Sequence, residues 1–218
     1  ATATTLYLGA PQPANGVMGN GMLGHTISND EPDRYTYDPA NVAVPEILKT
    51  GNPMEAEALE FRPYERQDNS LIYRTDAMTM PTTVAGPISV DLYFSSTAKD
   101  TDFFAALVDE DEKGKMHFIG QPGKVRASFM KSFNKRELIT PGKIYKANIK
   151  LWDTAAMIAK GHRLDLVIMS SMFPEYARNL NTGEPDISAT KMVAASQTIY
   201  HDKDHPSALH IQVYPFGG

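Results

Sequence analysis

The sequence predicts an all-β protein built as an antiparallel β-sandwich, and three observations support this prediction. About ten short segments show strand patterns, and several of them alternate strictly between apolar and polar residues. Turn-forming residues separate these segments. The helical signal is weak, and strands do not alternate regularly with helices, which argues against a doubly wound α/β fold. Short antiparallel strands packed as a sandwich account for all three observations.

The first 69 residues contain one clear strand followed by an irregular stretch. Ala1–Leu8 has the pattern of a strand, and a chain that begins inside a strand is expected to be part of a longer polypeptide. Proline and glycine then recur, which is typical of turns and loops. We interpret residues 1–69 as an ordered wrap over a surface, because apolar anchors are spread along it: Tyr35, Tyr37, Val42, Val44, Ile47 and Leu48.

Residues 70–218 are expected to supply the sandwich core. Side chains two positions apart share a face of a strand, so alternation marks a half-buried strand. In chain order, the expected strands are Leu71–Arg74, Ile88–Ser95, Phe103–Val108, Met116–Ile119, Ile144–Leu151, Leu164–Ser170, Gln197–His201 and Leu209–Val213.

Three connecting segments have their own signals. Asp109–Gly114 is expected to be a polar hairpin turn between two strands. Thr154–Ala159 is expected to form a turn or two of helix, with Asp153 as its N-cap and Gly161 at its end. Val125–Phe133 is ambiguous between strand and helix.

Composition excludes several classes of protein. The 218 residues carry 21 Lys and Arg against 26 Asp and Glu, a net charge of −5, without the basic stripe of a nucleic-acid-binding protein. No apolar run approaches the ~18 residues of a membrane helix. The absence of Cys removes disulfides, thiolate zinc sites and cysteine nucleophiles. The compartment is not indicated.

Motifs for catalysis or metal binding are weak. There is no Gly-x-Ser-x-Gly turn, no phosphate-binding glycine loop and no His-Glu-x-x-His. His201 and His205 have metal-ligand spacing on a helix, but on an extended segment they would lie ~13 Å apart, too far for one ion. We therefore interpret them as part of a polar loop. Asp109–Glu112 offers oxygens for calcium, although a hairpin tip explains it better.

Aromatic and histidine residues also have structural explanations. Phe103, Phe104, Tyr93 and Phe94 alternate on strands and are expected mostly in the core, with a carbohydrate-stacking platform as the alternative. Trp152 is expected to pack in the core or at a sheet edge, and His162 is expected to be structural because no nucleophile turn lies near it. We assign no catalytic, cofactor-binding or metal-binding residue and expect no cofactor.

Six motifs in order carry a resemblance to a known family. Together they resemble the C-terminal, non-catalytic domain of the X-Pro dipeptidyl-peptidase and cocaine-esterase group (CocE/NonD) of serine hydrolases. The match covers nearly the whole chain, and the motifs are Tyr37–Pro45, Tyr73–Asp76, Val84–Pro87, Ser95–Phe104, Gly161–Gly183 and His201–Ser207.

The resemblance implies a jelly-roll sandwich of the galactose-binding-like type and a single C-terminal domain over residues 1–218. It also implies that the catalytic serine, aspartate and histidine lie in an upstream α/β-hydrolase domain absent from this chain. The family motifs are expected to specify the fold: Arg163, Asp102 and Arg178 could form buried ion pairs, with the pairing left open.

Two functions from different classes follow. The first is a non-catalytic module of an acyl esterase or an X-Pro dipeptidyl-peptidase, packed on the catalytic domain and shaping its entrance, with the Pro/Gly-rich first third as the interdomain surface. The alternative is a binding module for carbohydrate or another ligand, which rests on fold analogy. The partner of the first is the upstream hydrolase domain; no nucleic acid or membrane is expected, and self-association through a sheet edge is left open.

Overall fold

The computed structural model describes residues 1–42, 69–185 and 188–215, and within them the chain is all-β. The one short helical element in these residues is the 3₁₀ turn η3 (Ala127–Phe129). No helix in the described part is long and apolar enough to cross a membrane. The strands are β1 (Thr2–Gly9), β2 (Gly21–Gly24), β3 (Asp33–Tyr37), β4 (Ser70–Arg74), β5 (Thr82–Gly86), β6 (Ser89–Ser96), β7 (Asp102–Glu110), β8 (Met116–Arg126), β9 (Tyr145–Lys150), β10 (Thr154–Ile158), β11 (Arg163–Met169), β12 (Ala195–Tyr200) and β13 (Ala208–Pro215).

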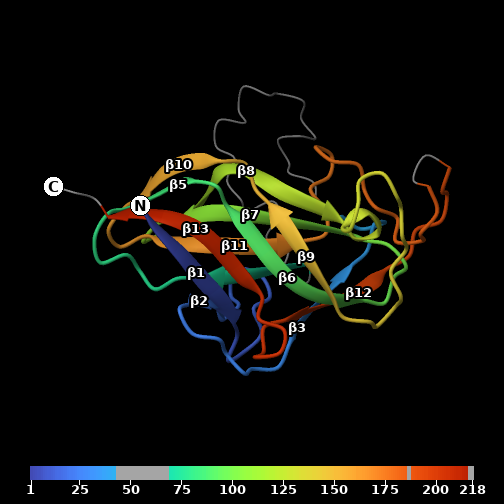
Figure 1. The fold of residues 1–218 in the computed structure, drawn as a ribbon, viewed down its shortest axis with the longest axis horizontal. Helices are drawn as coiled ribbons and strands as arrows, with labels where there is room; N and C mark the ends of the chain where they lie inside the picture. Colours follow the sequence, from blue (N-terminus) through green and yellow to red (C-terminus); the bar gives the residue numbers. More distant parts are fainter. Residues whose placement is uncertain (43–68, 186–187, 216–218) are drawn as a thin grey trace.

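The strands form one continuous hydrogen-bonded path that folds back on itself as a sandwich (Figure 1). The path runs β3-β12-β6-β13-β1-β2-β4-β11-β7-β8, with β9 paired to β6 and β5 linking β13 to β10. The two halves of the path face each other, since the rings of Phe94 on β6 and Phe103 on β7 lie 4.4 Å apart between centroids. The predicted β-sandwich is confirmed, whereas the galactose-binding-like type stays a prediction.

Alternating residues build the core as the sequence predicted. On β6, Val90, Leu92 and Phe94 are fully buried, and on β9 Ala147 and Ile149 are buried between exposed neighbours. The strand β11 is buried on both faces, which explains its continuous apolar run. Each of the nine predicted strands corresponds to an observed one, within the usual shift of a residue or two at the ends, except that β8 continues seven residues beyond Ile119, to Arg126.

The expected helix at Thr154–Ala159 is wrong, because this segment is the strand β10. It pairs antiparallel with β5, and Ile158 is fully buried while Met157 faces solvent. Gly161 does end the segment, at φ 86°, and its N–H donates to the carbonyl of Met78. Small residues on β5 and β10 give little alternation, so the pairing partner decides the conformation.

The first third contributes more strands than expected. Besides β1 it supplies β2 and β3, and β1 lies between β13 and β2. Tyr35 and Tyr37 on β3 are buried anchors, and Val42 packs against the core. The other expected anchors, at positions 44, 47 and 48, lie outside the described residues.

The ambiguous segment Val125–Phe133 is mixed. It finishes β8 and then forms η3, after which the chain runs along the surface. The hairpin expected at Asp109–Gly114 is confirmed between β7 and β8, where the N–H of Asp111 bonds the carbonyl of Lys115 and Gly114 has φ 75°.

Candidate functional site

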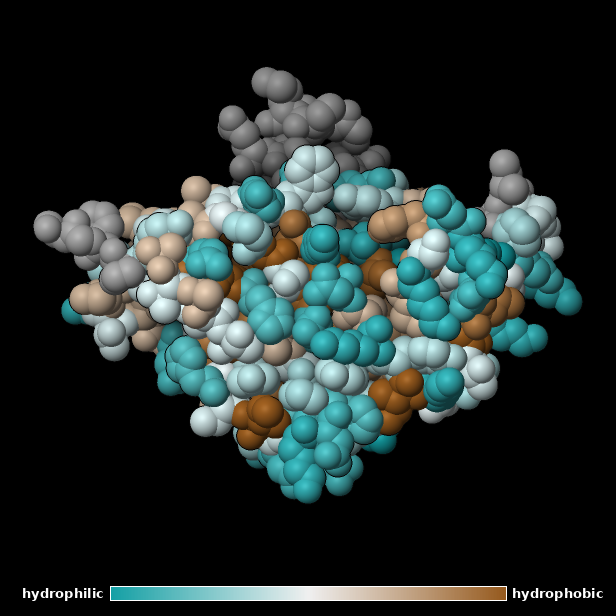
Figure 2. Space-filling view, viewed as in Figure 1, coloured by the Kyte–Doolittle hydropathy of each residue, from teal (hydrophilic) through white to brown (hydrophobic). Residues whose placement is uncertain are grey.

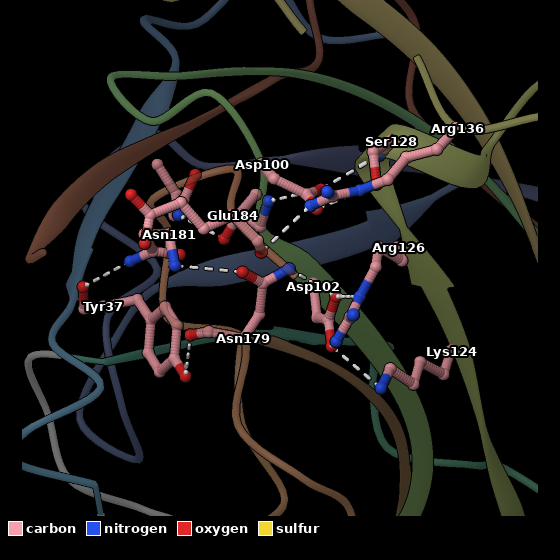
Figure 3. A network of polar contacts seen from close by, with 12 residues as sticks. Tyr37, Asp100, Asp102, Lys124, Arg126, Ser128, Arg136, Asn179, Asn181 and Glu184 are labelled. Carbon is pink, nitrogen blue, oxygen red and sulfur yellow. Dashed lines mark hydrogen bonds and ion pairs between the residues drawn. The ribbon is translucent and has the colours of Figure 1, made fainter. Parts of the chain in front are cut away.

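A polar network at one end of the sandwich joins β7, β8 and the loop after β11 (Figure 3). Its centre is Asp102, whose side chain is buried. The guanidinium of Arg126 donates to both carboxylate oxygens, at 2.7 and 3.1 Å, and the Nζ of Lys124 lies 2.8 Å from Oδ2. The Nδ2 of Asn179 donates to Oδ1 at 2.9 Å. Asp102 is therefore a fully satisfied anion that ties three segments together.

Asp100 forms a second, adjoining hub. Its Oδ1 accepts the backbone N–H of Thr101 and of Ser128, both at 3.0 Å. Its Oδ2 accepts the hydroxyl of Ser128 at 2.8 Å and the guanidinium of Arg136 at 3.0 Å. Arg136 also donates to the carbonyl of Glu184, so this hub links the start of β7 to two long loops.

The Asn-rich turn after residue 178 completes the network. The Oδ1 of Asn179 accepts the N–H of Asn181, which stands at φ 63°, a conformation that asparagine tolerates. The hydroxyl of Tyr37 donates to the carbonyl of Asn179 at 2.9 Å, and Asn181 donates to the carbonyl of Val193 at 2.7 Å. Three of the six sequence motifs meet here, which explains them as fold-specifying residues.

The ion pairs expected among Arg163, Asp102 and Arg178 do not form. The partners of Asp102 are Lys124 and Arg126, as given above. Arg178 donates to the carbonyl of Pro39 at 2.7 Å and lies over the ring of Phe173. Arg163 donates to the carbonyl of Thr75 at the surface.

A second buried network brings a serine, a histidine and an aspartate into one line. The Oγ of Ser28 lies 3.2 Å from Nδ1 of His201, and Nε2 of His201 lies 3.1 Å from Oδ2 of Asp33. The hydroxyl of Tyr73 also donates to Oδ2 of Asp33, at 2.9 Å, while Oδ1 accepts the N–H of Ala14. Burial raises the pKa of Tyr73 well above its ordinary value, so this hydroxyl keeps its proton.

Ser28, His201 and Asp33 form a structural network and not a catalytic triad. A hydrolase histidine must take a proton from serine and deliver it to a leaving group, which needs an accessible ring and an oxyanion hole. The side chain of His201 is entirely buried, and both of its nitrogens already face a partner. This network could not be predicted from the sequence, because its members come from three segments that lie far apart in the chain.

The other histidines are separate from it. His205 contacts the carboxylate of Asp202 three residues earlier, at 3.3 Å, and His162 contacts Asp109 at 2.9 Å. Within residues 1–42, 69–185 and 188–215, no group of three or more His, Asp or Glu side chains could hold a metal ion.

The acidic residues of the β7–β8 hairpin point to different partners. The carboxylate of Glu110 accepts from Nε of Arg74 at 3.0 Å. The Oδ1 of Asp111 accepts the N–H of Lys113 and of Lys115, each at 2.8 Å. The bond from Lys115 and, to a smaller extent, the bond from Lys113 hold the pKa of Asp111 below its usual value. This is the hydrogen bonding of a hairpin tip, as the sequence suggested.

The aromatic residues divide between core and surface. Phe94, Phe103 and Phe104 are buried, so these three cannot line a carbohydrate platform. Tyr93 packs edge-on against His205. Trp152 is 69% exposed just after the edge strand β9, so of the two expected placements, core or sheet edge, the core is wrong.

Asp165 is the carboxyl that the structure satisfies least. It is fully buried on β11, and no hydrogen bond from a described residue reaches its oxygens. The Nε of Arg74 lies 3.5 Å away but donates to Glu110 instead. Burial raises the pKa of Asp165 to about 8, with the attraction of Arg74 opposing the shift and the charge of Glu110 adding to it.

An apolar groove opens where β1, β2, β5 and β13 come together. Its volume is about 450 Å³, and its lining includes Leu6, Leu23, Met78 and Ile211. On the opposite face of the same sheet, Tyr214, Thr83 and Met157 are adjacent across β13, β5 and β10. Tyr214 is 42% and Met157 54% exposed, and Met80, just before β5, is 53% exposed. We call this groove, together with the exposed side chains of Met80, Met157 and Tyr214 at the same end of the sheet, the apolar end.

Comparisons with known proteins agree with this architecture. The model of the X-Pro dipeptidyl-peptidase C-terminal non-catalytic domain matches residues 1–210. The cocaine esterase of Rhodococcus sp. (strain MB1 Bresler) is 35% identical over 216 residues, which are 96% of this chain and 37% of the esterase.

Solved structures share the fold. An alpha-amino acid ester hydrolase superposes with a TM-score of 0.86 at 23% identity, over 98% of this chain and 36% of its own. An aminopeptidase from a marine sediment archaeon of the Thaumarchaeota gives a TM-score of 0.81 at 21% identity, over 98% of this chain and 37% of its own. The chain thus spans a little over a third of the length of this esterase and of these two structures.

Proposed function

Because the chain belongs to the X-Pro dipeptidyl-peptidase C-terminal non-catalytic domain family, we propose that residues 1–218 act as one domain that packs on an upstream α/β-hydrolase domain of the same polypeptide. The family assignment makes the domain non-catalytic. The two buried networks are consistent with this division of labour, since their polar groups are used to join segments. The reaction itself then belongs to the hydrolase domain.

The observation that carries the docking proposal is the apolar end. Soluble proteins rarely leave a groove of core-type residues and several exposed large apolar side chains at one end of a sheet without covering them. The start of β1 lies at the same end, since Thr2 pairs with Val213 near the end of β13 (Figure 1). A domain that preceded residue 1 would therefore be attached next to this surface.

The proposed reaction of the whole protein is acyl transfer to water, on esters or on X-Pro amides. A serine attacks the carbonyl, a histidine moves the proton, and an oxyanion hole stabilises the tetrahedral intermediate. The sequence relative is named as an esterase, and the two structural neighbours are named as an amino acid ester hydrolase and an aminopeptidase. Each of these names describes the cleavage of a bond to a carbonyl carbon. The carbohydrate-binding alternative is not favoured, because three of its four proposed aromatic residues are buried.

Surface variants test the docking. Met157→Lys with Tyr214→Ser alters only exposed side chains, so the thermal unfolding of the 218-residue chain should stay unchanged. In the full product of the reading frame, the same pair should lower the first unfolding transition by several degrees, because it places a charge in an apolar interface. Met18→Lys, at a side chain 77% exposed outside the apolar end, is the matched control. Equal effects of the two variants would count against the proposal.

Fluorophosphonate labelling tests the assignment of catalysis. The full product should be labelled, and the 218-residue chain should not. Labelling of the short chain that disappears in Ser28→Ala would make Ser28 a nucleophile and overturn the division of labour.

A further inference from the structure

A second groove lies on the opposite margin of the sandwich, between the two edge strands β8 and β9. Its volume is about 760 Å³, within the range of sites that take small organic molecules. The strands approach closely at its end, where Gly123 faces the carbonyl of Lys150 without room for a side chain. The end of η3 and the chain after it, from Phe129 to Phe133, form its remaining wall.

The charge of this groove contrasts with that of the chain. The protein carries a net charge of −5, yet the residues that line the groove include four cations and no carboxylate: Lys124, Arg126, Lys131 and Lys150. Behind the wall, the single negative charge of the buried Asp102 faces the two positive charges of Lys124 and Arg126. Glu137 offsets Lys131 from the solvent side. The remaining charge is positive, which attracts anions.

The groove also has an apolar floor and an aromatic rim. Val125 and Met130 are half-buried against the core and form part of its lining. Phe133 is 95% exposed, the highest value among the exposed large apolar side chains of the described chain. Figure 2 shows how apolar side chains gather into separate patches between polar ones on the face it presents. A flat apolar body could stack on Phe133 while an anionic group meets Lys150.

We propose that this groove is a binding site for an amphipathic organic anion, a flat apolar group that carries a carboxylate or a similar acid. The cations select the charge, and Phe133 with the floor selects the apolar body. The site is separate from the apolar end and does not depend on the proposed docking. Its lining comes from β8, β9 and the segment 129–133, none of which contributes to that end.

The test uses 2-naphthoate as the probe and follows the amide ¹H–¹⁵N resonances of the 218-residue chain. We expect saturable shifts confined to residues 124–133 and 148–150, with weaker binding as salt increases. The neutral analogue 2-naphthalenemethanol lacks the charge and acetate lacks the apolar body, so both should bind more weakly.

Variants locate the site. Lys150→Glu should weaken binding about 5- to 10-fold, because an attraction becomes a repulsion at a solvent-exposed site. Phe133→Ser should weaken it about 3-fold through lost stacking. Lys203→Glu, an exposed lysine on a distant turn, makes the same charge change and should leave binding unaltered.

Four outcomes would overturn the proposal. They are no saturable shift up to about 10 mM probe, equal binding of the alcohol, equal loss in the Lys203 control, and binding of hexaglutamate without binding of naphthoate. The last would assign the groove to an acidic protein partner. None of these results bears on the docking of the catalytic domain, so the two proposals fail separately.

Discussion

Removing the carboxylate of Asp102 should destabilise the domain more than any surface ion pair does. In Asp102→Ala, Arg126 and Lys124 lose their shared anion, and the Nδ2 of Asn179 loses its acceptor. The two cationic side chains are 22% and 26% exposed, so water recovers part of their loss, whereas Asn179 is buried. Breaking a buried ion pair from one side costs about 3–5 kcal/mol.

A loss of this size is a large share of the roughly 5–15 kcal/mol that stabilises a typical domain. For a chain of this length it corresponds to a fall of about 6–20 °C in the melting temperature. Urea unfolding followed by circular dichroism measures it, and the midpoint should fall while the slope stays constant. If the variant does not fold, Asp102→Asn keeps an oxygen for Asn179 and should show a smaller loss of the same sign.

The matched control is Glu137→Gln. This carboxylate also lies 2.9 Å from each of two cations, Lys131 and Lys135, which hold its pKa at about 2, but all three groups face solvent. Water replaces such contacts, so its stability should barely change. If Asp102→Ala cost no more than Glu137→Gln, the network would contribute nothing beyond surface charge, and our account of the sequence motifs would be refuted.

Three further changes test other parts of the structure. The pKa of an aspartate is near 4 in an unfolded chain, whereas burial raises the pKa of Asp165 to about 8 in the folded state. Between these two values the folded state holds one more proton, so the free energy of unfolding should fall as the pH rises. In Asp165→Asn this part of the pH dependence, at most about 1.4 kcal/mol per pH unit, should vanish from denaturation curves taken from pH 4 to 9. Gly161→Ala should cost about 1–2 kcal/mol by the same assay, because φ 86° is strained for alanine, and an unchanged midpoint would contradict this. Tyr73→Phe should cost about 1–2 kcal/mol by leaving Asp33 with one donor fewer, and a neutral result would show that water replaces the hydroxyl.

Strands with a strong two-residue period could be predicted from the sequence, whereas strands defined by their partners could not. On β6 and β9 large apolar residues alternate with polar ones, so the chain itself specifies which face is buried. On β10, Ala155 and Ala156 fit helix and strand equally well, and only β5 decides between them. Trp152 similarly follows an alternating strand but lies where that strand leaves the core.

The networks show the same limit at the level of single contacts. The motifs around Asp102 and Asn179 could be found in the sequence and ascribed to the fold. Their mutual hydrogen bond joins residues 77 positions apart, and no local rule selects Asn179 over Arg178 as the partner. The line from Ser28 to His201 spans 173 positions and was missed for the same reason.

The central place of β1 has a consequence for the way the domain is made. Thr5 pairs with His210, so the first strand finds one of its two neighbours only when the last strand is available. Folding is slow because the chain loses the entropy of closing this long loop before the contacts between the two strands can stabilise it. On the ribosome, the hairpin of β7 and β8 can form early, but β1 must wait beside β2 with one edge open until residues 208–215 emerge. During synthesis a chaperone would be needed to cover that open edge. A premature stop codon that removed residues 208–215 would leave the edge without its partner strand.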